Sequence, residues 1–349
     1  MRNVKVWQSK LYIVFEEGQG TALPQAARRI RASVNQSLHL PDSRVSDYSD
    51  IMSIAISPPA RRLPAPSAAL QLIKPITWFP PMWAYLCGAV SSGVSPAGQW
   101  PLVFLGVVLA GPIVCGMSQA ANDWCDRHVD AINEPDRPIP SGRIPGRWGL
   151  WIALAMTVLA IFIGYRLGPW GFGATLLAIA AAWAYSAEPV RAKRSGIWGP
   201  GLCGLAYETL PWVTGAAVLA GGAPSGAVLV IALLYGLGAH GIMTLNDFKA
   251  IEGDRQMGLR SLPVTLGPAR AARVACVVMA IPQAGVIALL FWWDKPLHAL
   301  AIAVLLAGQM AAMRVLLRDP EAKTPWYQGV GILLYITGMM IAAFAVRGL

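Results

Sequence analysis

Long apolar runs alternate with short polar connections along the chain, from about residue 76 to its end. Each run is near the roughly 20 residues that a helix needs to cross the hydrocarbon core of a membrane. The pattern therefore predicts an all-α membrane protein with nine transmembrane helices. The predicted helices cover residues 76–94, 101–121, 148–167, 170–185, 199–219, 227–245, 271–293, 297–317 and 326–346.

The composition agrees with this class. Hydrophobic residues make up 55% of the 349 residues and charged residues only 13%, and the mean hydropathy is +0.50. Soluble domains contain about 25% charged residues. The composition therefore excludes an ordinary soluble protein.

The first 66 residues follow a different pattern. They mix charged residues, Pro and Ser, without an apolar stretch long enough to span a membrane or to act as a signal sequence. We predict a disordered cytoplasmic extension over residues 1–66 and a polytopic membrane domain over residues 67–349. Met52 offers a second start position, which would remove about the first fifty residues.

The basic residues predict the orientation in the membrane. With the N-terminus in the cytoplasm, all of the 28 Lys and Arg residues except Arg166, Lys295 and Arg347 fall on the cytoplasmic side, as the positive-inside rule requires. This topology, together with attraction to anionic membrane lipid, explains the net charge of +10. We expect no nucleic-acid partner, because the basic residues lie in separate membrane loops.

Two acidic clusters stand at the predicted cytoplasmic ends of the second and sixth helices. The first consists of Asn122, Asp123, Asp126 and Asp130, and the second of Asn246, Asp247 and Asp254. The spacing within each places the side chains on one face of a continuing helix. Carboxylates near lipid are unfavourable unless they bind cations, and Mg²⁺ takes oxygen ligands from one or two carboxylates and from substrate phosphates. We therefore predict that the five aspartates bind Mg²⁺ and that they, with Asn122, are catalytic.

Basic residues lie next to both clusters and could bind a diphosphate. They are Arg137 and Arg143 after the first cluster, Arg191 and Lys193 after the fourth helix, and Lys249, Arg255 and Arg260 around the second cluster. The alternative is that they only anchor the loops at the membrane surface. Three further residues are candidates for the lining of a cavity: Tyr185, Glu208 and Asn246. Glu208 stands out because an ionisable residue inside a membrane span is usually functional.

The two clusters also indicate an internal repeat. Their Asn-Asp pairs are 124 residues apart, so helices one to four and five to eight would form two four-helix repeats, with the ninth helix left over. Four spans return the chain to the same side of the membrane, so the halves would be parallel copies about an axis along the membrane normal.

Several motifs resemble the UbiA-type intramembrane prenyltransferases over roughly residues 70–345. They are Asn122-Asp123-x-x-Asp126-x-x-x-Asp130, Asp136-Arg137-Pro138, and Tyr185-Ser186 followed by Pro189, Arg191 and Lys193. Residues 122–143, 246–255 and 261–264 look more narrowly like the chlorophyll and bacteriochlorophyll synthase branch. Many family members carry a further Asp where this chain has Ala250, and a small residue there is what that branch leads us to expect.

The resemblance implies a UbiA-type bundle and a Mg²⁺-dependent reaction. A geranylgeranyl or phytyl group would pass from its diphosphate to the propionate carboxylate of bacteriochlorophyllide or chlorophyllide. The cations would stabilise the departing diphosphate, and water must be excluded because hydrolysis would compete. The implied location is the inner, photosynthetic membrane of a bacterium, with the active-site loops in the cytoplasm.

Two alternatives stay open at this point. One is another prenyltransferase of the same family, acting on an aromatic acid, a quinone precursor or haem. The other is a secondary transporter, which also places carboxylates in a bundle built from repeats. Transporter sites lie near the membrane midplane on broken helices, whereas both clusters here begin at helix ends and continue into connections of about 20 to 25 residues.

Overall fold

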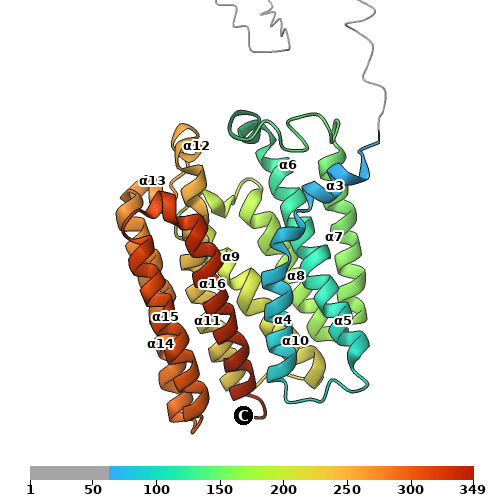
Figure 1. Cartoon of the computed structure of the whole chain (residues 1–349). Helices are drawn as coiled ribbons and strands as arrows, with labels where there is room; N and C mark the ends of the chain where they lie inside the picture. Colours follow the sequence, from blue (N-terminus) through green and yellow to red (C-terminus); the bar gives the residue numbers. More distant parts are fainter. Residues whose placement is uncertain (1–62) are drawn as a thin grey trace, which may run out of the picture. The chain divides into compact units, whose positions relative to one another are not determined.

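A computed structural model describes residues 63–349 of the chain (Figure 1). The disordered extension and the second start predicted from the sequence lie almost entirely outside the described residues. Residues 63–65 have no regular secondary structure, and the first described helix, α3 (Pro66–Leu72), begins at Pro66. The boundary between extension and membrane domain stays a prediction.

Seven helical runs within residues 63–349 are long and apolar enough to cross a membrane. The runs are Trp100–Ala131, Trp148–Arg166, Trp198–Ala220, Gly226–Gln256, Pro268–Trp292, Pro296–Leu316 and Pro320–Ala345. The other two predicted spans correspond to α4 (Phe79–Ser91) and α8 (Gly168–Ser186). With 13 residues, α4 is shorter than a full crossing, and α8, with 19 residues, is not among the seven runs. The all-α membrane class is confirmed, but the count of nine spans is not confirmed in full.

Three of the runs contain more than one helical segment. The first combines α5 (Trp100–Val108), the π-helix η3 (Leu109–Cys115) and α6 (Gly116–Asn133). The next combines α9 (Trp198–Gly204), the π-helix η5 (Leu205–Thr209) and α10 (Leu210–Ala220). The last combines α11 (Gly226–Asn246), the 3-10 helix η6 (Asp247–Ala250) and α12 (Ile251–Gln256).

The remaining helices are continuous or short. The long ones are α7 (Trp148–Arg166), α14 (Pro268–Trp292), α15 (Pro296–Leu316) and α16 (Pro320–Ala345). The short ones are η2 (Pro75–Thr77), η4 (Ala192–Arg194) and α13 (Leu262–Leu266). Proline stands in the first turn of most helices, where its missing N–H costs no hydrogen bond.

Glycine allows close packing between α4 and α10, which stand far apart in the sequence. A Cβ at Gly88 would lie 1.9 Å from the carbonyl oxygen of Trp212, and one at Gly215 would lie 2.2 Å from that of Tyr85. Small residues let helix backbones approach in membrane proteins, where the apolar lipid does not drive helices together. This contact fixes α4 against the middle of the bundle.

The polar loops gather at one end of the bundle. In Figure 1, α3, α12 and α13 lie at the same end, and the C-terminus lies at the other. Because α6 and α12 both end there, the two acidic clusters share one end of the bundle, as the sequence predicted. The internal repeat of four helices stays a prediction.

Candidate active site

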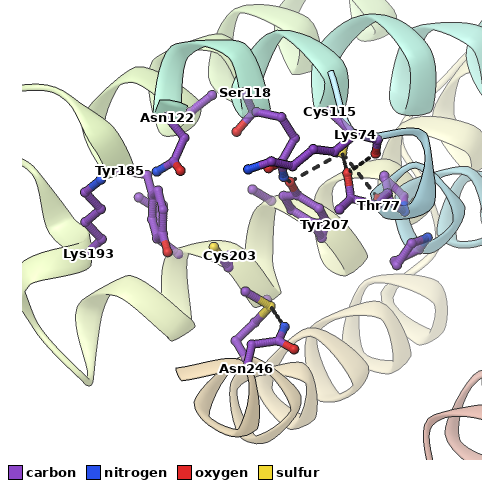
Figure 2. Close-up of a pocket in the computed structure, with 18 of the residues that line it drawn as sticks. Lys74, Thr77, Cys115, Ser118, Asn122, Tyr185, Lys193, Cys203, Tyr207 and Asn246 are labelled. Carbon is purple, nitrogen blue, oxygen red and sulfur yellow. Dashed lines mark hydrogen bonds between the residues drawn. The ribbon is translucent and has the colours of Figure 1, made fainter. Parts of the chain in front are cut away.

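A cavity of about 1330 Å³ extends from the end of the bundle that carries the polar loops into the middle of the helices. Both acidic clusters line it, and α12 contacts α6. In Figure 2, Asn122 of α6 and Asn246 of α11 face the cavity from different sides, with Cys203 and Tyr207 also in its wall. The end of the cavity beside the polar loops is therefore charged, and the part that lies deeper among the helices is mainly apolar.

The first acidic cluster lies on a continuous α-helix. Because α6 extends to Asn133, Asn122, Asp126 and Asp130 stand one turn apart, and all three line the cavity. Asp123 is only 1% exposed and is absent from the lining. The shared face predicted for Asn122, Asp126 and Asp130 is thus present. The prediction that Asp123 shares this face of the cavity is wrong, because its carboxylate is buried against Lys74 and Arg137 instead.

Basic side chains from two connections pair with Asp123 and Asp130. Lys74 Nζ lies 2.7 Å from Asp123 Oδ1, and Arg137 Nη1 lies 3.4 Å from the same oxygen. Arg137 Nη1 also lies 2.9 Å from Asp130 Oδ2, and its Nε donates to Glu134. These ion pairs hold the segment before α4 and the loop after α6 against the acidic helix.

Asp126 is paired by the loop that follows α8. Arg191 Nη2 lies 3.0 Å from Asp126 Oδ1, and Lys193 Nζ contacts Oδ2. Burial lowers the pKa of the Lys193 ammonium, an effect that the Asp126 carboxylate opposes. Lys193 also lines the cavity, so its charge faces the space where an anionic ligand would bind.

Two of these basic residues have a strained backbone. Lys74 has φ of 45° and Arg191 has φ of 37°, in the left-handed region that residues with a Cβ rarely adopt. Among residues 63–349, Asp294 is the only other residue besides glycine with positive φ. Such strain is often found at functional sites, and here it occurs at two residues that pair with the first cluster.

The second acidic cluster has a different local structure. The chain leaves α11 through the 3-10 helix η6 and then enters α12, so Asp247 and Asp254 do not stand on one continuous α-helix. Both nevertheless line the cavity. Within residues 63–349, neither carboxylate has an ion pair, and Ser261 is the polar neighbour of Asp254. Glu252 also lines the cavity and pairs with Arg255 at 3.0 Å.

The backbone joins the loops beside the two clusters. Ser195 and Arg260 form a parallel bridge, in which Gly196 N donates to Arg260 O at 2.9 Å and Arg260 N donates to Arg194 O at 3.0 Å. A Cβ at Gly196 would lie 2.5 Å from the backbone nitrogen of Leu262. Glycine is therefore required where the two loops meet.

The structure does not bring every predicted residue to the cavity. Tyr185, Lys249, Asn246 and Glu208 line it, as do Arg137 and Lys193. By contrast, Arg143 is exposed and donates to Gln71 Oε1 and to the Asp136 carbonyl. Arg255 and Arg260 are also exposed and are absent from the lining. Arg191 pairs with Asp126 but is also absent from the lining. Being next to a cluster in the sequence did not place these four side chains in the cavity.

A comparison with protein families matches residues 77–345 to the UbiA prenyltransferase family. The chain belongs to this family. It is 68% identical to the bacteriochlorophyll synthase 33 kDa chain of Cereibacter sphaeroides over 85% of this chain and 99% of that protein. It is 35% identical to the chloroplastic chlorophyll synthase of Arabidopsis thaliana over 79% of this chain and 73% of that protein.

The fold of this UbiA family member is also found among solved structures. A UbiA homologue from Archaeoglobus fulgidus, solved bound to DMAPP and Mg²⁺, aligns with a TM-score of 0.61 and covers 81% of this chain and 99% of that chain. The two sequences are 20% identical. The UbiA-type fold and the prenyltransferase class predicted from the sequence are confirmed, and the chain is an integral membrane protein.

Several residues that line the cavity were not found by sequence reasoning. Lys74 lines the cavity and pairs with Asp123, and its signal was a lone Lys-Pro just before the first apolar run. Gln328 of α16 donates to Asn246 Oδ1 at 2.6 Å. Gln119 Nε2 donates to the hydroxyl of Tyr207 at 3.1 Å. The last two contacts join distant spans, and the local sequence contains no signal for them.

The donor set of the cavity fits Mg²⁺ when substrate supplies further ligands. Within residues 63–349 no three His, Cys, Asp or Glu side chains already converge as a metal centre. The cavity is instead lined by separated hard oxygen donors from α6, η6 and α12. Such an open arrangement suits Mg²⁺, which keeps several waters and is commonly shared with phosphate oxygens.

Proposed function

We propose that the chain transfers a geranylgeranyl or phytyl group from its diphosphate to the propionate carboxylate of bacteriochlorophyllide. The observation that carries this proposal is one cavity lined by both acidic clusters at its charged end and by apolar helix surface in its depth. An amphipathic prenyl diphosphate has the same two parts. The 68% identity to a bacteriochlorophyll synthase over nearly all of that protein supports the acceptor.

The charged end binds the diphosphate. Asp126 and Asp130 on one side and Asp247 and Asp254 on the other would hold Mg²⁺, whose charge stabilises the diphosphate as the C–O bond breaks. Lys193 lines the same end and adds a fixed positive charge where negative charge develops. Arg137 orients Asp130 and is itself part of the cavity wall.

The acceptor needs little activation from the protein. Its propionate has an ordinary carboxyl pKa and is ionised near neutral pH, so no strong general base is required. The protein must instead position this carboxylate beside the allylic carbon and exclude water, which would compete as a nucleophile. The part of the cavity that lies among the helices would both position the carboxylate and exclude water.

The location follows from the same proposal. The acidic end and the N-terminus lie in the cytoplasm, and the helices span the inner, photosynthetic membrane of a bacterium, where the pigment product would be used. The concentration of Lys and Arg at the loops beside the clusters supports this orientation.

The test uses purified protein in detergent with Mg²⁺, both prenyl diphosphates and four acceptors. The acceptors are bacteriochlorophyllide, chlorophyllide, 4-hydroxybenzoate and haem, and mass spectrometry identifies the products. We expect a prenyl ester of bacteriochlorophyllide and none after exhaustive chelation. Undiminished esterification in the chelated sample contradicts the role of Mg²⁺, and prenylation of only 4-hydroxybenzoate or haem contradicts the acceptor.

A further inference from the structure

A carboxyl group without a partner stands in the apolar wall of the cavity. Glu208, in the π-helix η5, is only 5% exposed and lines the cavity. Its Oε2 is buried without a hydrogen-bond partner, and within residues 63–349 no Lys, Arg or His pairs with Glu208. A buried polar group that finds no partner in the protein is unfavourable.

The residues on either side of Glu208 hold it in this position. The hydroxyl of Tyr207 accepts hydrogen bonds from Gln119 Nε2 at 3.1 Å and Cys115 Sγ at 3.4 Å (Figure 2). Thr209 Oγ1 donates to Ala232 O at 3.0 Å. With both neighbours fixed to other helices, η5 cannot easily turn Glu208 toward a partner in the protein.

Close packing behind η5 adds to this restraint. A Cβ at Gly236 of α11 would lie 1.9 Å from Thr209 Oγ1, and one at Gly204 would lie 2.3 Å from the Gly236 carbonyl oxygen. The backbone at the end of α9 therefore lies directly against α11, and the Thr209 side chain at the end of η5 packs on Gly236. A π-helical segment inside an α-helix often marks a functional position, and this one leaves one polar side chain free to meet a ligand.

An apolar ligand group would not satisfy the hydrogen-bonding capacity of Glu208. A prenyl chain is pure hydrocarbon and would leave the carboxyl unsatisfied throughout the reaction. The ring of a bacteriochlorophyllide, in contrast, has oxygen substituents that accept hydrogen bonds, and its ring nitrogens are held by the central metal. A neutral carboxylic acid has the O–H that such an oxygen needs.

We propose, on the basis of the function proposed above, that Glu208 determines acceptor specificity by donating a hydrogen bond to the acetyl oxygen of bacteriochlorophyllide. Of the oxygen substituents on this ring, the ketone and the methyl ester lie beside the reacting propionate, and the acetyl group lies furthest from it. Glu208 is about ten residues along the helix from Trp198, which begins α9 near Lys193. This is a depth of roughly 15 Å, which suits the distant substituent.

The hydrogen bond would separate two closely related acceptors. Chlorophyllide carries a vinyl group where bacteriochlorophyllide carries the acetyl group, and a vinyl group cannot accept a hydrogen bond from Glu208. A site built around a hydrogen bond rejects the analogue that lacks it, because the protein group is left unpaired. The two acceptors also differ in the reduction of the second ring, so a test must separate these features.

The experiment measures kcat/KM with four acceptors that combine either substituent with either ring oxidation state. For the wild-type protein we expect a preference of about 10- to 100-fold for the acetyl group, whatever the state of the second ring. Glu208→Leu should reduce this ratio to about one or invert it. Glu208→Gln should retain a preference, because its amide still donates a hydrogen bond.

Gln283→Leu is the matched control. Gln283 is 1% exposed, also has a buried oxygen without a partner, and lies in α14 outside the cavity lining. The acetyl preference should be unchanged in this variant. A resonance Raman measurement on wild-type protein needs no variant: the acetyl carbonyl stretch of bound bacteriochlorophyllide should shift to lower frequency than in aprotic solvent.

The outcomes separate this inference from the proposed function. If wild-type protein esterifies both pigments with equal efficiency, or the acetyl stretch does not shift, the role of Glu208 is overturned while the activity stands. An equal loss with all four acceptors in Glu208→Leu, without a change in ratio, also overturns it. If wild-type protein esterifies no pigment, both proposals fail.

Discussion

The two acidic clusters line one cavity but differ in their surroundings. Every aspartate of the first cluster has a basic partner within 3.0 Å: Lys74 for Asp123, Arg191 for Asp126 and Arg137 for Asp130. Within residues 63–349, Asp247 and Asp254 of the second cluster have no ion pair at all. The two clusters have similar sequence patterns, but only the aspartates of the first are paired with basic residues in the fold.

This difference indicates that the two clusters have different roles. The first cluster holds the basic connections around the cavity as well as offering oxygen donors, so its charges contribute to the structure. The second presents carboxylates that form no ion pair within the described residues, although Lys249 and Lys193 are near enough to act on their charge. A bound cation would stabilise them. Removing a carboxylate should therefore affect activity in both clusters but stability in only one.

The largest effect is expected at the second cluster, on activity alone. Asp254→Asn should lower turnover by roughly 1000-fold, because a donor to the metal and diphosphate is lost. Its melting temperature in detergent should be unchanged or higher, since no cation loses a partner. Asp294→Asn, in the connection between α14 and α15, is the control and should keep wild-type turnover. A marked drop in the melting temperature of Asp254→Asn would remove the proposed distinction.

At the first cluster we expect a loss of both activity and stability. Asp123→Asn leaves Lys74 and Arg137 without the carboxylate between them, and those side chains are 24% and 20% exposed. Because both retain some access to solvent, the loss of unfolding free energy should be moderate, about 1–3 kcal/mol. Thermal unfolding in detergent, measured beside the turnover of the same sample, checks this. A variant as stable as wild type would mean that these ion pairs contribute nothing.

The sequence was sufficient for the features that depend on local patterns. Apolar runs of the right length predicted where helices cross the membrane, although α4 proved shorter than its apolar run. The i, i+4 spacing of Asn122, Asp126 and Asp130 predicted their shared face, because α6 continues as a regular helix. The sequence also predicted that both clusters lie at one end of the bundle, because the four spans between them return the chain to the same side of the membrane.

Features that depend on direction or on distant contacts could not be predicted. Arg255 follows Asp254 directly, but successive residues on a helix point about 100° apart, so the carboxylate lines the cavity and the guanidinium does not. The π-helices η3 and η5 have the same apolar character as an α-helix, so hydropathy could not reveal them. Likewise, nothing near Asp123 in the sequence identifies Lys74 as its partner.

A smaller effect should separate the basic residues of the two clusters. Lys193 has a side chain only 9% exposed and contacts Asp126, whereas Lys249 is exposed although it lines the cavity. We expect Lys193→Met to weaken prenyl diphosphate binding by about 10- to 100-fold, and Lys249→Met by much less, since water screens its charge. Competition binding with a non-hydrolysable diphosphate analogue measures both. Equal effects would show that burial beside the first cluster gives Lys193 no advantage.

The smallest effect is expected for the basic residues that lie outside the cavity lining. Arg255 pairs with Glu252 on the surface, where both side chains are more than half exposed, and such a pair contributes about 0–1 kcal/mol. Arg255→Ala should therefore change kcat/KM by no more than about threefold. Arg137→Ala gives the contrast, because Arg137 lies in the cavity wall beside Asp130, and it should lower kcat/KM far more. If Arg255→Ala proved as damaging as Arg137→Ala, the loop that carries α12 must close over the substrate and bring Arg255 inward, and the second cluster would then acquire its positive charges only when the diphosphate is bound.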